Sequence, residues 1–113
     1  MQTGWTDEAS GDQWTVHVFG DLDLETGPPL RDHLASVLAR SAELVVDMTA
    51  VEFCDSSGLG ALVATRRRAL LLDRRLVLRL ESHGRVHRLL ELSGLADSFE
   101  LDPVPVATLS GPA

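Results

Sequence analysis

The alternation of apolar and polar positions predicts several short strands. Residues 14–19, WTVHVF, place apolar side chains at every second position, which is the period of a strand with one buried face. Residues 44–48 hold a compact apolar run that indicates a buried strand. Residues 74–80 alternate again, and residues 99–101 indicate a last short strand. Gly20 is expected to end the first of these strands.

Three segments between the strands have the spacing of helices. The first is expected to begin at the Gly-Pro-Pro of residues 27–29, because proline is tolerated in the first turn of a helix. It should continue to about residue 40. The second covers about residues 57–72 and the third residues 85–92. The apolar face of the second helix is expected to consist of Leu59, Leu62, Val63 and Leu70.

Buried strands that alternate with helices predict an α/β fold, a small mixed β-sheet with helices packed on it. Part of the sheet should be parallel, with room for an antiparallel pairing of the first strands at one edge. The 113 residues fit one domain with its core at about 14–102. An edge strand that includes Trp5 is left open, and residues 103–113 are expected to form a loose tail after Pro103 and Pro105.

Composition limits the cellular setting. No apolar run approaches the roughly 18 residues of a membrane span, and the polar, acidic start MQTGWTDEASGD is not a signal peptide. Cys54 is the single cysteine, so no disulfide can form within the chain. These features favour a cytoplasmic protein, and a monomer or weak dimer is expected.

The net charge of −7 is unevenly distributed. Residues 1–55 carry eleven acidic side chains and two arginines, whereas residues 56–113 carry six acidic side chains and eight arginines. The acidic half suggests a basic protein partner. Direct binding of nucleic acid is disfavoured, because the consecutive arginines 66–68 fan out around a helix and few aromatic side chains are present to stack bases.

Enzyme and metal chemistry have weak support. The chain has no lysine, so a phosphate-binding loop of the P-loop kind is excluded. His83 and His87 are four residues apart, but Gly84 lies between them and no third ligand follows, so no metal site is expected. Cys54 is interpreted as a buried structural thiol, although a base from elsewhere in the fold could make it a nucleophile.

Four aspartates follow or end predicted strands and could gather as an acid cluster, although solvated turn residues are the preferred interpretation. They are Asp21, Asp23, Asp47 and Asp55.

The segment DSSGLG, residues 55–60, lies where a buried strand passes into a helix. Ser56 and Ser57 are therefore expected at the helix N-terminus, where unpaired N–H groups and the helix dipole favour negative charge. A serine here is either a plain helix cap or a site at which phosphate is accepted. The residues alone leave both alternatives open.

Three segments resemble the STAS-domain anti-sigma factor antagonists. VVDMTAVEFCDSSGLGALV resembles the phosphorylation segment of that family, GDLDLETGPPLRDHL its acidic strand-to-helix segment, and RVHRLLELSGLADSFEL its C-terminal helix and strand. The resemblance covers about residues 14–102 and is most specific at DSSGLG.

This resemblance implies a protein that captures an anti-sigma factor, usually also a serine kinase, and so releases a sigma factor. The phosphate acceptor would be Ser57, with Ser56 as the lesser candidate, and a serine phosphatase would reset the switch. No cofactor, metal or catalytic residue is implied. The expected partner-binding residues are Asp21, Asp23, Asp55, Ser56, Ser57, Gly58 and Leu59.

Two alternatives stay open. One is a ligand-sensing or scaffold STAS module whose serine is not phosphorylated, and the other is an enzyme that uses Cys54 or the carboxylates. A local departure is Arg66, which a helical projection places on the apolar face of the second helix. Its guanidinium is expected either to extend to solvent or to pair with an acid.

Overall fold

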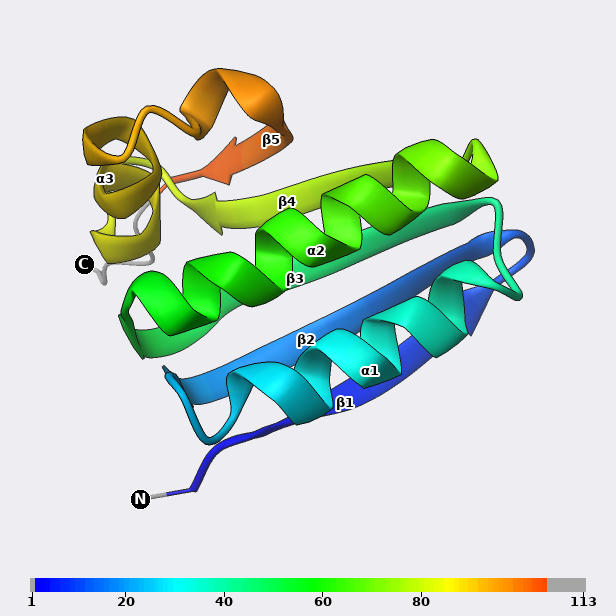
Figure 1. Ribbon diagram of the computed structural model, residues 1–113, viewed down its shortest axis with the longest axis horizontal. Helices are drawn as coiled ribbons and strands as arrows, with labels where there is room; N and C mark the ends of the chain where they lie inside the picture. The colour runs from blue at the N-terminus through cyan, green and yellow to red at the C-terminus, as the bar shows by residue number, and fades with distance from the viewer. Residues whose placement is uncertain (1, 106–113) are drawn as a thin grey trace, which may run out of the picture.

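Five strands form one sheet in chain order in the computed structural model, which describes residues 2–105 (Figure 1). The first strand pairs antiparallel with the second, and the remaining pairs are parallel. This confirms the mixed α/β fold and the strand around Trp5. The strands are β1 (Gly4–Ser10), β2 (Gln13–Leu22), β3 (Glu43–Cys54), β4 (Arg75–Glu81) and β5 (Glu100–Val104).

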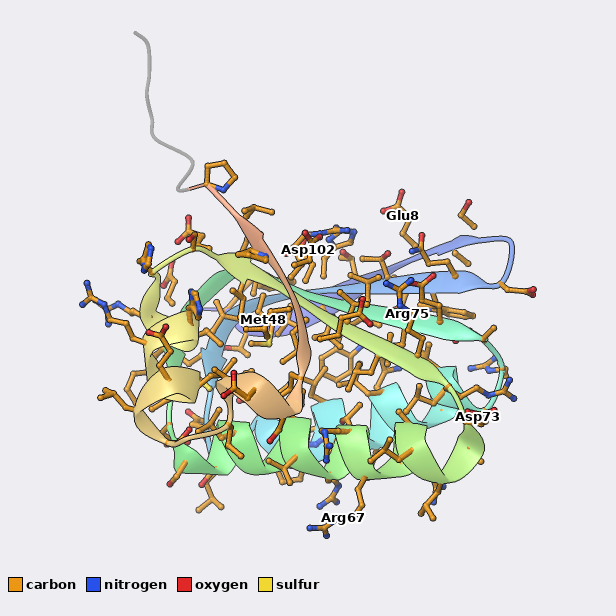
Figure 2. The ribbon with its side chains drawn as sticks, turned by 90° about the horizontal axis from the view of Figure 1, so that it is seen from above. Glu8, Met48, Arg67, Asp73, Arg75 and Asp102 are labelled. Atoms are coloured by element: carbon orange, nitrogen blue, oxygen red, sulfur yellow. The ribbon has the colours of Figure 1, made fainter. Side chains whose placement is uncertain are left out.

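The helices lie on one face of the sheet. Helices α1 (Gly27–Leu38) and α2 (Ser56–Leu72) run side by side across it, and Figure 2 shows the sheet above both of them. Helix α3 (Arg85–Leu92) packs against β3 and β4 near one end. Within residues 2–105 no helix covers the opposite face of the sheet. This face carries polar side chains such as His17, Asp47 and Arg79 around the buried Val45 and Val77.

The core fills the space between the sheet and the helices. Alternate residues of β2 point into it, so Val16 is fully buried and Val18 is 2 % exposed. Helix α1 contributes four buried apolar side chains, which are Leu30, Leu34, Val37 and Leu38. The largest fully buried side chains are Leu22, Leu30, Leu34, Leu38, Leu44, Met48, Leu62, Leu78, Leu80 and Leu90.

Two strands are longer than the sequence predicted. Strand β2 continues through Gly20 to Leu22, and β3 continues past residue 48 to Cys54. The parallel pairing holds both extensions together, with register shifts on either side of Gly20. Gly20 has φ of +87°, and a Cβ there would lie 2.4 Å from the carbonyl oxygen of Gln2. The glycine thus bends the strand without ending it.

The face that α2 buries differs from the predicted one. Leu59 and Leu62 are buried as expected, but the next buried side chains along the helix are those of Thr65 and Ala69. Leu70 lies about 100° further round the helix, and it is 64 % exposed. Arg66 is partly exposed and pairs with no acid within residues 2–105; its Nε donates instead to the carbonyl oxygen of Ser98 at the surface.

The C-terminal strand is longer than expected. A 3-10 turn, η1 (Ala96–Ser98), precedes β5, which includes Pro103 and ends at Val104. The prediction that Pro103 stops regular structure was wrong. Strand β5 is at the sheet edge, where a residue without an N–H can be accommodated. The rest of the expected tail, residues 106–113, lies outside the described residues.

Candidate functional site

The strand ends of β2 and β3 build the site. Parallel strands bring their carboxyl ends to the same edge, and here Leu22 pairs with Cys54. The N–H of Asp55 then donates to the carbonyl oxygen of Leu22 at 3.2 Å. The loop that leaves β2 and the first turn of α2 consequently begin beside each other.

Asp55 is the N-cap of α2. Its Oδ1 accepts from the N–H of Ser57 at 2.9 Å and from the N–H of Gly58 at 3.1 Å, while its carbonyl oxygen accepts from Leu59. Of the two alternatives left open for a serine here, the plain helix cap is therefore ruled out, because Asp55 holds that position. A carboxylate satisfies two unpaired N–H groups and also interacts favourably with the helix dipole.

Gly58 lets the first turn of α2 lie directly on the strand ends. A Cβ at this position would lie 2.7 Å from the carbonyl oxygen of Leu22 and 2.9 Å from Sγ of Cys54. Only glycine allows this approach. Gly58 and the neighbouring Leu59 are buried, so their part in any partner surface is to position Ser57.

The hydroxyls of Ser56 and Ser57 are both available. Ser56 is exposed and Ser57 half-buried, and within residues 2–105 neither hydroxyl forms a hydrogen bond. Ser57 lines an open groove of about 300 Å³ between the first turns of α1 and α2. This Ser57 groove is also lined by Leu24, Gly27, Pro28, Arg31, Gly60 and Ala61.

The loop from β2 to α1 is held by Asp23 and Thr26. Oδ1 of Asp23 accepts from the N–H groups of Glu25 and Thr26 at 3.0 and 3.1 Å, and the hydroxyl of Thr26 donates to the carbonyl oxygen of Asp21 at 2.6 Å. The bond from the Thr26 N–H, chiefly, lowers the pKa of Asp23. Asp23 therefore shapes the loop that presents Leu24, which is 75 % exposed.

The structure does not gather all predicted site residues. Leu22 points into the core, so the preceding Asp21 points toward the face of the sheet without helices. Leu24, Pro28 and Arg31, in contrast, share the groove with Ser57 and were missed from the sequence. The sequence did contain a signal that Leu24 is exposed. It is an apolar residue between Asp23 and Glu25, in a loop where no strand or helix covers it.

The acid cluster considered above does not form. Asp47 lies in the middle of β3, roughly 26 Å along the strand from Asp55. Its carboxylate instead contacts Nδ1 of His17 at 2.8 Å and accepts from the hydroxyl of Thr49 at 2.8 Å. Among residues 2–105 no group of three metal-ligating side chains is present.

Cys54 and the histidine pair are placed for structural roles. Burial, and secondly the charge of Asp55, raise the pKa of the Cys54 thiol to about 11. The thiol is thus protonated at neutral pH, which removes its nucleophilic form. His83 lies before α3, and its N–H donates to Nδ1 of His87 at 3.0 Å, so the two do not share one helix.

The amino-acid sequence is similar to a known family of domains along almost all of its length. The family model described as Mlab, STAS domain matches residues 5–104. The chain belongs to the STAS domain family. This STAS domain is 30 % identical over 98 residues to the anti-sigma-B factor antagonist of Listeria monocytogenes, covering 86 % of this chain and 85 % of that protein.

Solved structures show the same fold. An anti-sigma factor antagonist from Mycobacterium paratuberculosis superposes on this STAS domain with a TM-score of 0.80 and 29 % identity, covering 91 % of this chain and 87 % of that one. The anti-sigma factor antagonist SpoIIAA, solved in its unphosphorylated form, gives a TM-score of 0.70 with 14 % identity and covers 89 % of each chain. At that identity the likeness shows the fold alone. No helix in the described part of the chain has the length and apolar character to cross a membrane.

Proposed function

We propose that this STAS domain is an anti-sigma factor antagonist, a binding switch without catalytic chemistry of its own that acts in the cytoplasm. Its relatives in Listeria monocytogenes and Bacillus subtilis carry the name anti-sigma-B factor antagonist. The switch residue is Ser57, the partner is an anti-sigma factor with serine kinase activity, and a serine phosphatase removes the phosphate. Binding of the unphosphorylated form frees a sigma factor.

The observation that carries this proposal is the position of the Ser57 hydroxyl. It lies at the second residue of α2, beside the Ser57 groove and without a hydrogen bond inside the described residues. A phosphate there adds about −1.5 to −2 charges to the surface. Because Asp55 rather than Ser57 caps the helix, the added charge alters the surface and leaves the fold intact.

The electrostatic effect would act on the partner. Asp55 already supplies the negative charge at the helix N-terminus and occupies the N–H groups of Ser57 and Gly58. A phosphate on Ser57 would find these donors used and a carboxylate beside it, so it would project toward the bound protein. A partner surface fitted to a neutral hydroxyl would then be repelled or desolvated unfavourably.

The test is phosphorylation by an anti-sigma factor kinase with ATP, followed by mass spectrometry. The phosphate should map to Ser57, Ser57→Ala should accept none, and the matched variant Ser56→Ala should be phosphorylated like the wild type. Ser57→Ala should bind the anti-sigma factor as tightly as the unphosphorylated wild type does. Ser57→Asp should bind it at least tenfold more weakly. Should Ser57→Asp bind as tightly as Ser57→Ala, with no phosphate on either serine, the ligand-sensing alternative would replace this function.

A further inference from the structure

A second groove lies at the other end of α2. It has a volume of about 260 Å³ and is bordered by the C-terminal half of α2, the start of β4, and η1 with the start of β5. Its lining includes Arg66, Arg74, Leu70 and Phe99, and we call it the arginine groove. From Ser57 to Leu70 the helix rises roughly 20 Å, so this groove is separate from the Ser57 groove.

Arginine charges in this groove are not all neutralised. Arg75, which also lines it, contacts Glu43 at 2.8 Å and Glu100. Within residues 2–105 neither Arg66 nor Arg74 forms an ion pair with a carboxylate. Arg66 uses its Nε on the carbonyl oxygen of Ser98, which leaves its terminal N–H groups for another acceptor.

Arg74 carries a buried donor without an acceptor. Its Nε is inaccessible to solvent and forms no hydrogen bond in the described structure. Buried polar groups in native proteins are almost always paired, so such a group is a sign of an absent acceptor such as an ion. An acceptor in the groove that Arg74 lines would meet its terminal N–H groups, because the Nε has no accessible surface; within residues 2–105 those terminal groups form no hydrogen bond.

The chemistry of the lining selects the kind of ligand. A guanidinium offers a planar fork of N–H donors that matches phosphate oxygens. Three such groups border the groove, and two of them, Arg66 and Arg74, form no ion pair within residues 2–105. Glu100, the acid in the lining, has its charge engaged by Arg75. Leu70 is 64 % exposed and Phe99 is half-buried, so the same groove has an apolar wall.

We propose that the arginine groove binds a small phosphomonoester. The phosphate lies between Arg66 and Arg74, and the apolar part of the ligand packs on Leu70 and Phe99. This binding is independent of Ser57 phosphorylation, because the two grooves lie at opposite ends of α2.

The test uses phenyl phosphate and inorganic phosphate as probes in low-salt buffer, followed by amide NMR shifts and calorimetry. Phenyl phosphate should bind saturably at one site, shift the amides of residues that line the groove, and bind at least threefold more tightly than inorganic phosphate. Arg74→Gln and Arg66→Gln should each weaken it at least tenfold. Equal affinity for the two probes would contradict the proposed packing of the ligand on Leu70 and Phe99. The absence of saturable binding by either probe would overturn the whole proposal.

Two variants control for charge and for folding. Figure 2 shows Arg67 projecting from the outer side of α2, away from the sheet, so Arg67→Gln removes the same charge outside the groove and should leave binding unchanged. Equal weakening by Arg67→Gln would mean non-specific attraction and would overturn the proposal. Leu70→Ala changes an exposed side chain, so it should fold normally and lose the preference for phenyl phosphate. Ser57→Ala should bind both probes like the wild type, whatever the fate of the proposed switch.

Discussion

The carboxylate of Asp55 holds the helix that carries Ser57, accepting from the Ser57 N–H at 2.9 Å. This contact assigns the helix cap to Asp55, whereas the sequence alone left a serine open both as the cap and as a phosphate acceptor. Asp55 stabilises the helix start, and the Ser57 hydroxyl is left for chemistry on the surface. In the proposed switch, phosphorylation of Ser57 would therefore change the surface without removing the cap.

Replacement of Asp55 tests this separation. Asp55→Ala removes the cap of α2 and should lower the free energy of unfolding by about 0.5–2 kcal/mol. Asp55→Asn keeps an oxygen acceptor and should retain most of the stability. Ser57→Ala and Ser56→Ala should stay within about 0.5 kcal/mol of the wild type. Urea unfolding followed by circular dichroism measures all four, and a larger loss for Ser57→Ala than for Asp55→Ala would contradict the assignment of the cap.

A pair of glycines in the same turn gives a second test. Gly58→Ala would place a Cβ 2.7 Å from the carbonyl oxygen of Leu22, and the strand end would have to move. We expect a loss of about 1–3 kcal/mol. Gly60→Ala has no atom within 4 Å of the new Cβ, and should stabilise the helix by about 0.5–1 kcal/mol. Thermal melting of the two variants should therefore shift in opposite directions from the wild type.

His17 predicts a pH dependence of stability. It lies on the face of the sheet without helices, between Glu8 on β1 and Asp47 on β3, at 3.0 and 2.8 Å. These hydrogen bonds, with Glu8 first and Asp47 second, raise the pKa of His17 above its ordinary value of 6.5. The folded protein therefore holds this proton more tightly than the unfolded chain. The resulting stability is fully present below pH 6.5 and is lost as the pH rises through the raised pKa.

The measurement for His17 is the melting temperature from pH 5.5 to 9 in the wild type and in His17→Gln. The difference between the two should be largest at the acidic end and should shrink as the pH rises. His33 and His87 also contact carboxylates, but they are present in both proteins and cancel in the difference. Parallel profiles for the two proteins would mean that His17 has the same pKa in the folded and unfolded states, which contradicts this prediction.

The order of the elements could be predicted because each apolar face repeats with its own period. Residues 14–19 and 30–38 show one buried face each, and the structure buries those faces. The ends of β2 and β3 could not be predicted in this way. They are extended by pairing between strands about 30 residues apart, and Gly20 and Asp21 at the end of β2 have a local composition that is typical of turns.

The candidate site was predictable in position and not in detail. The DSSGLG segment places Ser57 at a helix N-terminus, as expected. The identity of the cap depends on which of three adjacent oxygen-bearing side chains turns back toward the helix, and neither spacing nor propensity decides this. The Ser57 groove joins the β2–α1 loop and the first turns of α1 and α2, which are distant in the sequence, so Arg31 and Leu24 shared no sequence signal with Ser57. Arg66 was flagged by its position, but its acceptor, a carbonyl oxygen in η1, carries no sequence signature.

Leu24 provides a test of where the partner binds, and it rests on the proposed antagonist function. Its side chain is 75 % exposed on the rim of the Ser57 groove, and burial of an exposed apolar side chain is a strong source of interface energy. Leu24→Ser should weaken binding of the anti-sigma factor at least tenfold, which corresponds to about 1.4 kcal/mol.

The matched control for Leu24 is Leu71, which is 77 % exposed near the other end of α2. Leu71→Ser removes the same apolar surface and should leave partner affinity unchanged. Both variants should retain the wild-type stability within about 0.5 kcal/mol, because neither side chain contributes to the core. Calorimetric titration of each variant with one anti-sigma factor gives the comparison. If Leu71→Ser weakened binding and Leu24→Ser did not, the partner would lie at the C-terminal end of α2, and the Ser57 groove would not be the interface.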